Sequence, residues 1–247
     1  MTNDVLLFIA IGFAAQIIDG AIGMAYGITA TTLLMSMGVS PATASASVHA
    51  AEVFTTAASG TAHWRMGNVD RKLVVRLAVP GMFGGAAGAY LLATIPGERI
   101  RPIVSAYLLV MGAMILWRAI WKERTEGKSP KHVGVLGLMG GFLDAIGGGG
   151  WGAMVTTTLI GRGATPRFAI GSANVAEFFI TATVTAMFVA TVGLTLWPVI
   201  TGLVIGGVVA APLAAYATKR LPEQPVMILV GVIVILLSTR GLVSAYW

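Results

Sequence analysis

Residues 19–57 read DGAIGMAYGITATTLLMSMGVSPATASASVHAAEVFTTA, and residues 144–182 read DAIGGGGWGAMVTTTLIGRGATPRFAIGSANVAEFFITA. Shifted by 125 places, the two stretches align without a gap and agree at 15 positions. The matches include two acids, three glycines and the proline of each copy: Asp19/Asp144, Glu52/Glu177, Gly23/Gly148, Gly27/Gly152, Gly38/Gly163 and Pro41/Pro166. Shared apolar composition would match only alanines and leucines, so this agreement indicates an internal duplication.

The composition is that of a chain embedded in lipid. Of the 247 residues, 56% are hydrophobic and 11% are charged, and the mean hydropathy is +0.85. The basic residues fall in short links between apolar runs, which argues against a nucleic-acid partner and makes the lipid bilayer the expected surrounding. The chain has no cysteine, which excludes disulfides and thiolate metal sites.

Eight apolar stretches are long enough for helices, at residues 4–38, 41–63, 72–95, 100–121, 132–161, 167–192, 195–217 and 225–246. The first and fifth are interrupted near the middle by glycines and an aspartate. The fold predicted is an all-α polytopic membrane protein of two repeats, each a broken or re-entrant helical segment plus three transmembrane helices. Residues 1–121 form the first repeat, 122–131 a basic cytoplasmic linker, and 132–247 the second repeat. The first stretch lacks a basic start and a cleavage site, so we expect a retained helix.

The distribution of positive charge favours inverted repeats. If each broken stretch returns to the side that it entered, 13 of the 16 Lys and Arg residues lie on one side, with Arg99, Arg101 and Arg240 opposite. If each crosses once, the division is 10 to 6, a poorer fit to the positive-inside rule. The sequence therefore predicts a multi-pass protein of the cell inner membrane with both termini extracytoplasmic.

Four acidic residues lie within apolar stretches, where a charge is costly: Asp19, Glu52, Asp144 and Glu177. One interpretation is ion or proton coupling, with His49 three residues before Glu52 and Asn174 at the same spacing before Glu177. The alternative is structural: the aspartates cap the helices that follow the breaks, and the glutamates make interhelical hydrogen bonds.

Glycines and hydroxyl residues at the breaks predict a substrate site. Two helix N-termini that meet at the midplane could hold an anion by backbone amides and dipoles. The alternative is close helix packing by glycine, with threonines bonded to their own helices. The candidate substrate-binding residues are Gly23, Tyr26, Gly27, Thr31, Gly148, Gly149, Trp151, Gly152, Thr156, Ser47, Ser172 and Asn174.

No lysine or arginine lies deep in any stretch, so an anion would be held by amides, hydroxyls and His49. The opposite possibility is a transporter or channel for Na⁺ or H⁺ that uses the four intramembrane carboxylates. The chain has no Walker lysine after GGGGWG, no HExxH and no GxSxG, so we expect no enzymatic activity, no cofactor and no resident metal.

The segments DGAIGMAYG, GVSPATASASVHAAEVFTT, SGTAHWRMGNVDRKL, DAIGGGGWG and GSANVAEFF together resemble the TauE/SafE family of sulfite and organosulfonate exporters. The resemblance covers nearly the whole chain and both halves. It implies secondary transport of sulfite, a sulfonate such as sulfoacetate, or a related small anion out of a prokaryotic cell. It brings no residue roles, so the site residues above rest on the repeats.

Overall fold

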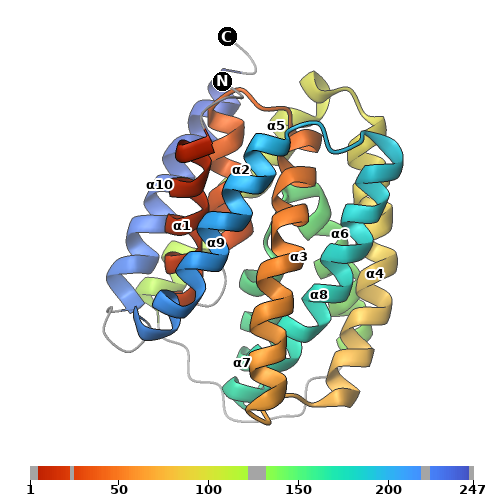
Figure 1. Ribbon diagram of the computed structural model, residues 1–247, viewed down its shortest axis with the longest axis vertical. Helices are drawn as coiled ribbons and strands as arrows, with labels where there is room; N and C mark the ends of the chain where they lie inside the picture. Colours follow the sequence, from red (N-terminus) through yellow and green to blue (C-terminus); the bar gives the residue numbers. More distant parts are fainter. Residues whose placement is uncertain (1–4, 23–24, 122–131, 218–222, 245–247) are drawn as a thin grey trace.

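The computed structural model describes residues 5–22, 25–121, 132–217 and 223–244, and every regular element in these ranges is helical (Figure 1). The all-α prediction is confirmed, and the proposed linker at 122–131 lies outside the described residues. The elements are α1 (Val5–Ile22), α2 (Tyr26–Ser36), α3 (Pro41–Arg65), α4 (Arg71–Thr94), α5 (Gly97–Ile120), α6 (Val133–Gly147), the π-helical turn η1 (Gly152–Thr156), α7 (Thr157–Gly161), α8 (Pro166–Thr191), α9 (Trp197–Ala217) and α10 (Glu223–Val243).

Both interrupted stretches are broken where the sequence predicted. The first becomes α1 and α2, and the fifth becomes α6, η1 and α7. The six other stretches each form one helix. The duplicated prolines Pro41 and Pro166 open α3 and α8, where the ring fixes φ for the first turn and the missing N–H costs no helical bond. Ser40 caps α3 by accepting a hydrogen bond from Thr43 N (3.3 Å).

The pattern of helix packing stays the same when each helix is replaced by its counterpart in the other half. A shift of 125 residues places α1 on α6, α3 on α8, α4 on α9 and α5 on α10. The main packing pairs are α1 with α9, α4 with α6, α3 with α8, and α5 with α10. In Figure 1, α3 runs from the upper to the lower end and α8 runs the opposite way. Inverted repeats would produce this arrangement, and the inverted relation itself stays a prediction.

Glycines allow two of these pairs to pack backbone against backbone. A Cβ on Gly84 of α4 would overlap the backbone carbonyl of Leu138 on α6, and one on Gly206 of α9 would overlap that of Ile9 on α1. Small residues at helix contacts are typical of membrane proteins, because close approach maximises van der Waals packing. The two glycines begin the similar segments GGAAGA and GGVVAA, and each allows close helix packing in its own half.

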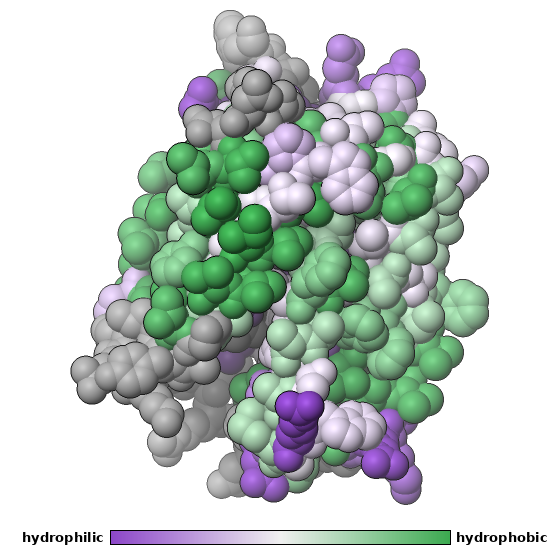
Figure 2. Space-filling model, viewed as in Figure 1, coloured by the Kyte–Doolittle hydropathy of each residue, from purple (hydrophilic) through white to green (hydrophobic). Residues whose placement is uncertain are grey.

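Four of the described helices are long and apolar enough to cross a membrane, at Arg71–Thr94, Gly97–Ile120, Arg167–Thr191 and Gln224–Val243. Figure 2 shows hydrophobic residues over the middle of this face and hydrophilic residues gathered at its two ends. α3 is less apolar because it carries His49, Glu52 and several hydroxyl residues, and these are mostly buried inside the bundle. The chain is therefore a polytopic membrane protein.

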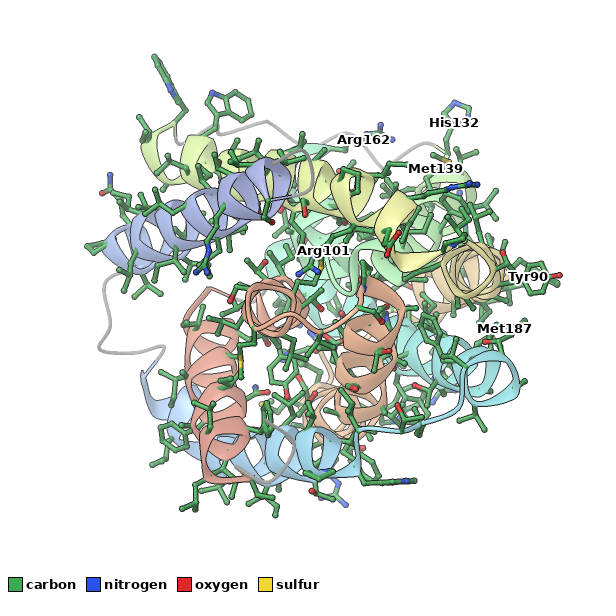
Figure 3. All side chains as sticks on the ribbon, turned by 90° about the horizontal axis from the view of Figure 1, so that it is seen from above. Tyr90, Arg101, His132, Met139, Arg162 and Met187 are labelled. Carbon is green, nitrogen blue, oxygen red and sulfur yellow. The ribbon has the colours of Figure 1, made fainter. Side chains whose placement is uncertain are left out.

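One arginine at the end where α3 begins turns inward. Figure 3, seen from that end, shows Arg101 of α5 directed between α5 and α2. Its Nη2 donates a hydrogen bond to the backbone carbonyl of Met35 (2.6 Å). That carbonyl lies in the last turn of α2, where it also accepts from Gly38 N (3.1 Å). Arg101 thus ties α5 to the end of the first broken segment.

Candidate substrate site between the two helix breaks

In the first break, Asp19 caps the helix that follows it. Its Oδ1 accepts hydrogen bonds from the backbone amides of Ala25 (2.9 Å) and Tyr26 (3.3 Å). These amides open α2 and would otherwise have no acceptor in a bilayer. Asp19 is therefore a helix cap, as the structural alternative predicted. The next amides of α2, those of Gly27 and Ile28, lie at the N-terminus of this helix.

The second break is built from glycines with positive φ. Gly148, Gly149 and Gly150 have φ of 67°, 143° and 135°, backbone conformations that side chains with a Cβ rarely adopt. Asp144 spans this turn, because its Oδ1 accepts from Trp151 N (2.9 Å) and its carbonyl accepts from Gly149 N (3.0 Å). The sequence reads GGGG because the chain reverses here inside the bundle.

The two breaks touch. A Cβ on Gly27 would lie 2.7 Å from Cα of Gly149 and 2.7 Å from Oε1 of Glu52, so only glycine fits. The hydroxyl of Thr31 donates across the halves to the backbone carbonyl of Gly148. Two segments 125 residues apart in sequence thus form one junction, as the duplication predicted.

A polar cavity of about 40 Å³ opens beside this junction. That volume holds a small ion or a few waters, because about 10–15 Å³ is needed for each water. Its lining combines three carboxylates, hydroxyls, amides and glycines: Gln16, Asp19, Tyr26, Gly27, Glu52, Thr55, Thr56, Ser59, Gly150, Gly152, Thr156, Asn174 and Glu177. No lysine, arginine or histidine is among these residues, so their formal charge is negative when the acids are ionised.

The duplicated glutamates face this cavity from facing helices, Glu52 from α3 and Glu177 from α8. Glu52 is 5% exposed, and its Oε2 has no hydrogen-bond partner among the described residues. An unpartnered carboxylate oxygen at this depth is costly unless a proton, an ion or water satisfies it. Glu52 thus presents an unpartnered carboxylate oxygen at the cavity.

Next to the cavity, His49 pairs with Asp144 of the other half. His49 is fully buried, and its Nε2 lies 3.2 Å from Asp144 Oδ2. Its Nδ1 lies 2.9 Å from the backbone carbonyl of Ser45, which can only accept, so Nδ1 carries a hydrogen. The Ser45 hydroxyl donates to the carbonyl of Ala145 (2.7 Å) and leaves Nδ1 as the donor towards Ser45 Oγ as well.

This geometry requires one proton between the histidine and the aspartate. With Nδ1–H committed to Ser45, neutral His49 and ionised Asp144 would present two acceptors to each other. A hydrogen bond at 3.2 Å needs either an imidazolium facing a carboxylate or a neutral imidazole facing a protonated carboxyl group. The pair therefore joins the two repeats through one buried contact between a histidine and an aspartate.

Eight of the predicted site residues line the cavity, five named for substrate and three for coupling: Tyr26, Gly27, Gly152, Thr156, Asn174, Asp19, Glu52 and Glu177. Six other predicted site residues form the junction between the breaks: Thr31, Gly148, Gly149, Trp151, His49 and Asp144. Ser47 and Ser172 make their hydrogen bonds outside the junction. Ser47 donates to Thr43 O within α3 (2.8 Å), and Ser172 accepts from Asp70 N (2.9 Å). Gly23 lies outside the described residues.

Sequence reasoning missed several polar residues of the site. Thr55, Thr56 and Ser59 follow Glu52 by three, four and seven residues, so they share its face of α3, a periodicity readable in the sequence. Gln16 precedes Asp19 by three residues in the same way. Tyr107 gave no such signal: its hydroxyl donates to Gly149 O (3.1 Å) from α5, which only the packing reveals.

An intramembrane polar cavity at the meeting point of two broken helices, with titratable groups on its walls, defines a membrane transporter. The comparisons agree. The chain belongs to the family described as sulfite exporter TauE/SafE, whose model matches residues 8–241. It is 40% identical over 254 residues to the probable membrane transporter protein YtnM of Bacillus subtilis (strain 168), covering 99% of this chain and 84% of that protein. No solved structure matches the chain.

Proposed function

We propose that this protein is a secondary transporter that exports a small sulfur-containing anion, such as sulfite or sulfoacetate, across the cell inner membrane. The family description and the transporter name of the relative support this class of substrate and of activity. We further propose that the halves are inverted repeats with both termini extracytoplasmic. The opposed directions of α3 and α8 and the 13 to 3 division of basic residues support that topology.

One observation carries the proposal: both helix breaks and both duplicated glutamates converge on a single small polar cavity. Amides at the N-terminus of α2 supply hydrogen-bond donors for an anion. The hydroxyls of Thr55, Thr56 and Ser59 donate to Glu52 O and Asn174 Oδ1 in this structure and would have to rotate to bind an anion. Because each repeat contributes one break, rocking of one repeat against the other would expose the cavity to alternate sides.

Electrostatics then assigns the role of the acids. An anion about 4 Å from one ionised carboxylate is repelled by about 4 kcal/mol at an effective dielectric constant near 20, and three carboxylates line this cavity. The anion therefore binds when Glu52 and Glu177 are protonated, and one of these protons travels with it. The His49–Asp144 pair is a third place for a proton beside the cavity.

The membrane potential favours export when the anion and the proton that moves with it keep a net negative charge. A divalent anion that carries one proton leaves with a net charge of −1, and the membrane potential favours that movement by about 2.3 kcal/mol per 100 mV. An outward concentration gradient of the anion adds to this driving force. Co-transport with protons is thus compatible with exit from the cell.

Proteoliposomes loaded with sulfoacetate test the proposal, because its sulfonate group stays ionised and does not itself carry protons near neutral pH. We expect saturable efflux and a simultaneous rise of lumenal pH reported by an internal dye. Glu52→Gln and Glu177→Gln should uncouple or stop this efflux. Absence of protein-dependent flux for sulfoacetate and for sulfite would refute the substrate class, whereas anion efflux without proton movement would refute only the coupling.

The acidic lining favours a second candidate, a transporter or channel for Na⁺ or H⁺. Three carboxylates and no basic side chain among the lining residues suit a cation as well as a protonated site. The same liposomes separate the two functions. Na⁺ flux that ignores every anion would select the cation function.

A further inference from the structure

An apolar groove of about 600 Å³ lies between α3, α4 and α8, outside the central cavity. Most of its wall is aliphatic or aromatic, and several of these side chains are exposed at the surface of the bundle, including Val75 and Phe179. The groove is lined by Thr56, Ala57, Gly60, Thr61, Trp64, Arg65, Arg71, Val74, Val75, Val175, Phe178 and Phe179. Its polar end and its apolar end differ sharply in chemistry.

The polar end carries two exposed arginines that no described acidic residue pairs with. Arg65 ends α3 and Arg71 begins α4. The neighbouring carboxylate of Asp70 is occupied as the cap of α4, where it accepts from the amides of Lys72 (2.9 Å) and Leu73 (3.3 Å). Within the described residues the close contact between a basic and an acidic side chain is that of His49 with Asp144, in the core.

An indole lies beside these charges. The guanidinium carbon of Arg71 sits 4.9 Å from the centre of the Trp64 ring, a cation–π contact that orients the arginine over the groove. Trp64 is 47% exposed. Tryptophan next to arginine at a helix end is typical of the level of lipid headgroups. Figure 2 shows hydrophilic residues at the lower end of the molecule, where α3 and α4 meet, below a hydrophobic middle.

We propose that this groove binds an anionic phospholipid of the leaflet at that end. The phosphate is held by Arg65 and Arg71, since basic pockets between transmembrane helices recognise such headgroups. An acyl chain lies along the apolar wall formed by α4 and α8. Charge complementarity selects this occupant: a second copy of the chain would bring the same two arginines against its partner, and a zwitterionic lipid would leave their charge uncompensated.

The site has a functional consequence because Thr56 lines both the groove and the central cavity. Its hydroxyl is bonded to the carbonyl of Glu52 within α3. A lipid seated in the groove therefore packs against the segment of α3 that forms one wall of the cavity. This proposal does not depend on which ion the cavity transports.

The test uses the full chain in detergent, titrated with phosphatidylglycerol or phosphatidylcholine, with binding followed by native mass spectrometry. We expect phosphatidylglycerol to bind preferentially. The double variant Arg65→Gln/Arg71→Gln should lose about 30-fold in affinity, as estimated for two basic residues near an anionic headgroup. The control Lys72→Gln/Arg76→Gln removes the same charge from the same end of α4, outside the groove, and should bind like the wild type.

A third variant tests the apolar end. Ala57→Leu places a larger side chain in the groove and should weaken binding of the long-chain lipid while both arginines remain. Equal losses in the groove and control pairs, or equal binding of both lipids, would overturn the proposal. So would a dimer cross-linked through groove residues. Arginine variants that change only the KM for the transported ion, with lipid binding intact, would make the groove an entrance for substrate and overturn it too.

Discussion

Replacing Asp144 by alanine and by asparagine separates its two roles. Alanine leaves the Trp151 amide without its acceptor, a loss of about 0.5–2 kcal/mol as for a helix cap, and strips buried His49 of its partner, a loss of about 3–5 kcal/mol. The sum is about 3.5–7 kcal/mol. At about 2–4 °C per kcal/mol for a chain of this length, we expect the melting temperature to fall by about 7–28 °C.

Asparagine at the same position keeps the hydrogen bonds. Its Oδ1 still accepts from Trp151, and its amide N–H donates to a neutral His49, so the change in stability should stay below about 1.5 kcal/mol. The proton between the two residues can no longer leave, because an amide does not release it near neutral pH. We therefore expect a folded protein whose transport no longer moves the proton held by this pair.

The duplication supplies a matched control. Asp19 is the copy of Asp144 and also caps a helix through two amides, but it has no histidine partner among the described residues. Asp19→Ala should therefore lower the melting temperature by about 1–8 °C. Thermal unfolding of these three variants and of the wild type in one detergent measures the difference. Equal losses for Asp19→Ala and Asp144→Ala would show that the pair with His49 contributes nothing to stability. Asp144→Asn that moves as many protons per anion as the wild type would refute the shared proton.

Three further changes test the junction and its supports. Gly27→Ala should cost about 1–3 kcal/mol and impair transport, because the added Cβ meets backbone of the second break. The control Gly134→Ala places its Cβ 3.6 Å from Pro80 Cγ and 3.9 Å from Arg76 O, both ordinary van der Waals contacts, and should unfold like the wild type. Trp151→Phe should cost about 1–3 kcal/mol by removing the indole hydrogen bond to Ala173 O of α8 and leaving a void beside a fully buried ring, measured as a lower melting temperature. Arg101→Gln should cost about 1.5–3 kcal/mol by removing the charged donor to Met35, and Arg101→Lys should restore part of it.

The helices and the location of the breaks were predictable because a bilayer permits few solutions. A run of apolar residues must be helical where no water can form hydrogen bonds with the backbone. Asp19 and Asp144 mark where the two apolar runs are interrupted. The meeting of the breaks was predictable from the duplication. The partner of His49 was not: its sequence neighbour Glu52 suggested a pair within α3, whereas the histidine reaches Asp144 of the other repeat. Such a contact depends on how α3 packs on α6, which periodicity does not encode.

The two halves of the site differ at one position of the duplication. The copy of His49 is Asn174, an amide that accepts from Ser59 Oγ (2.9 Å) and donates to Ile170 O (3.1 Å). An amide satisfies buried neighbours but holds no transferable proton, whereas the imidazole in the other half does. A pair of identical repeats would place equivalent protons at both breaks. With one histidine, only one repeat places an imidazole beside the cavity, and this is the asymmetry that the proposed proton coupling would use.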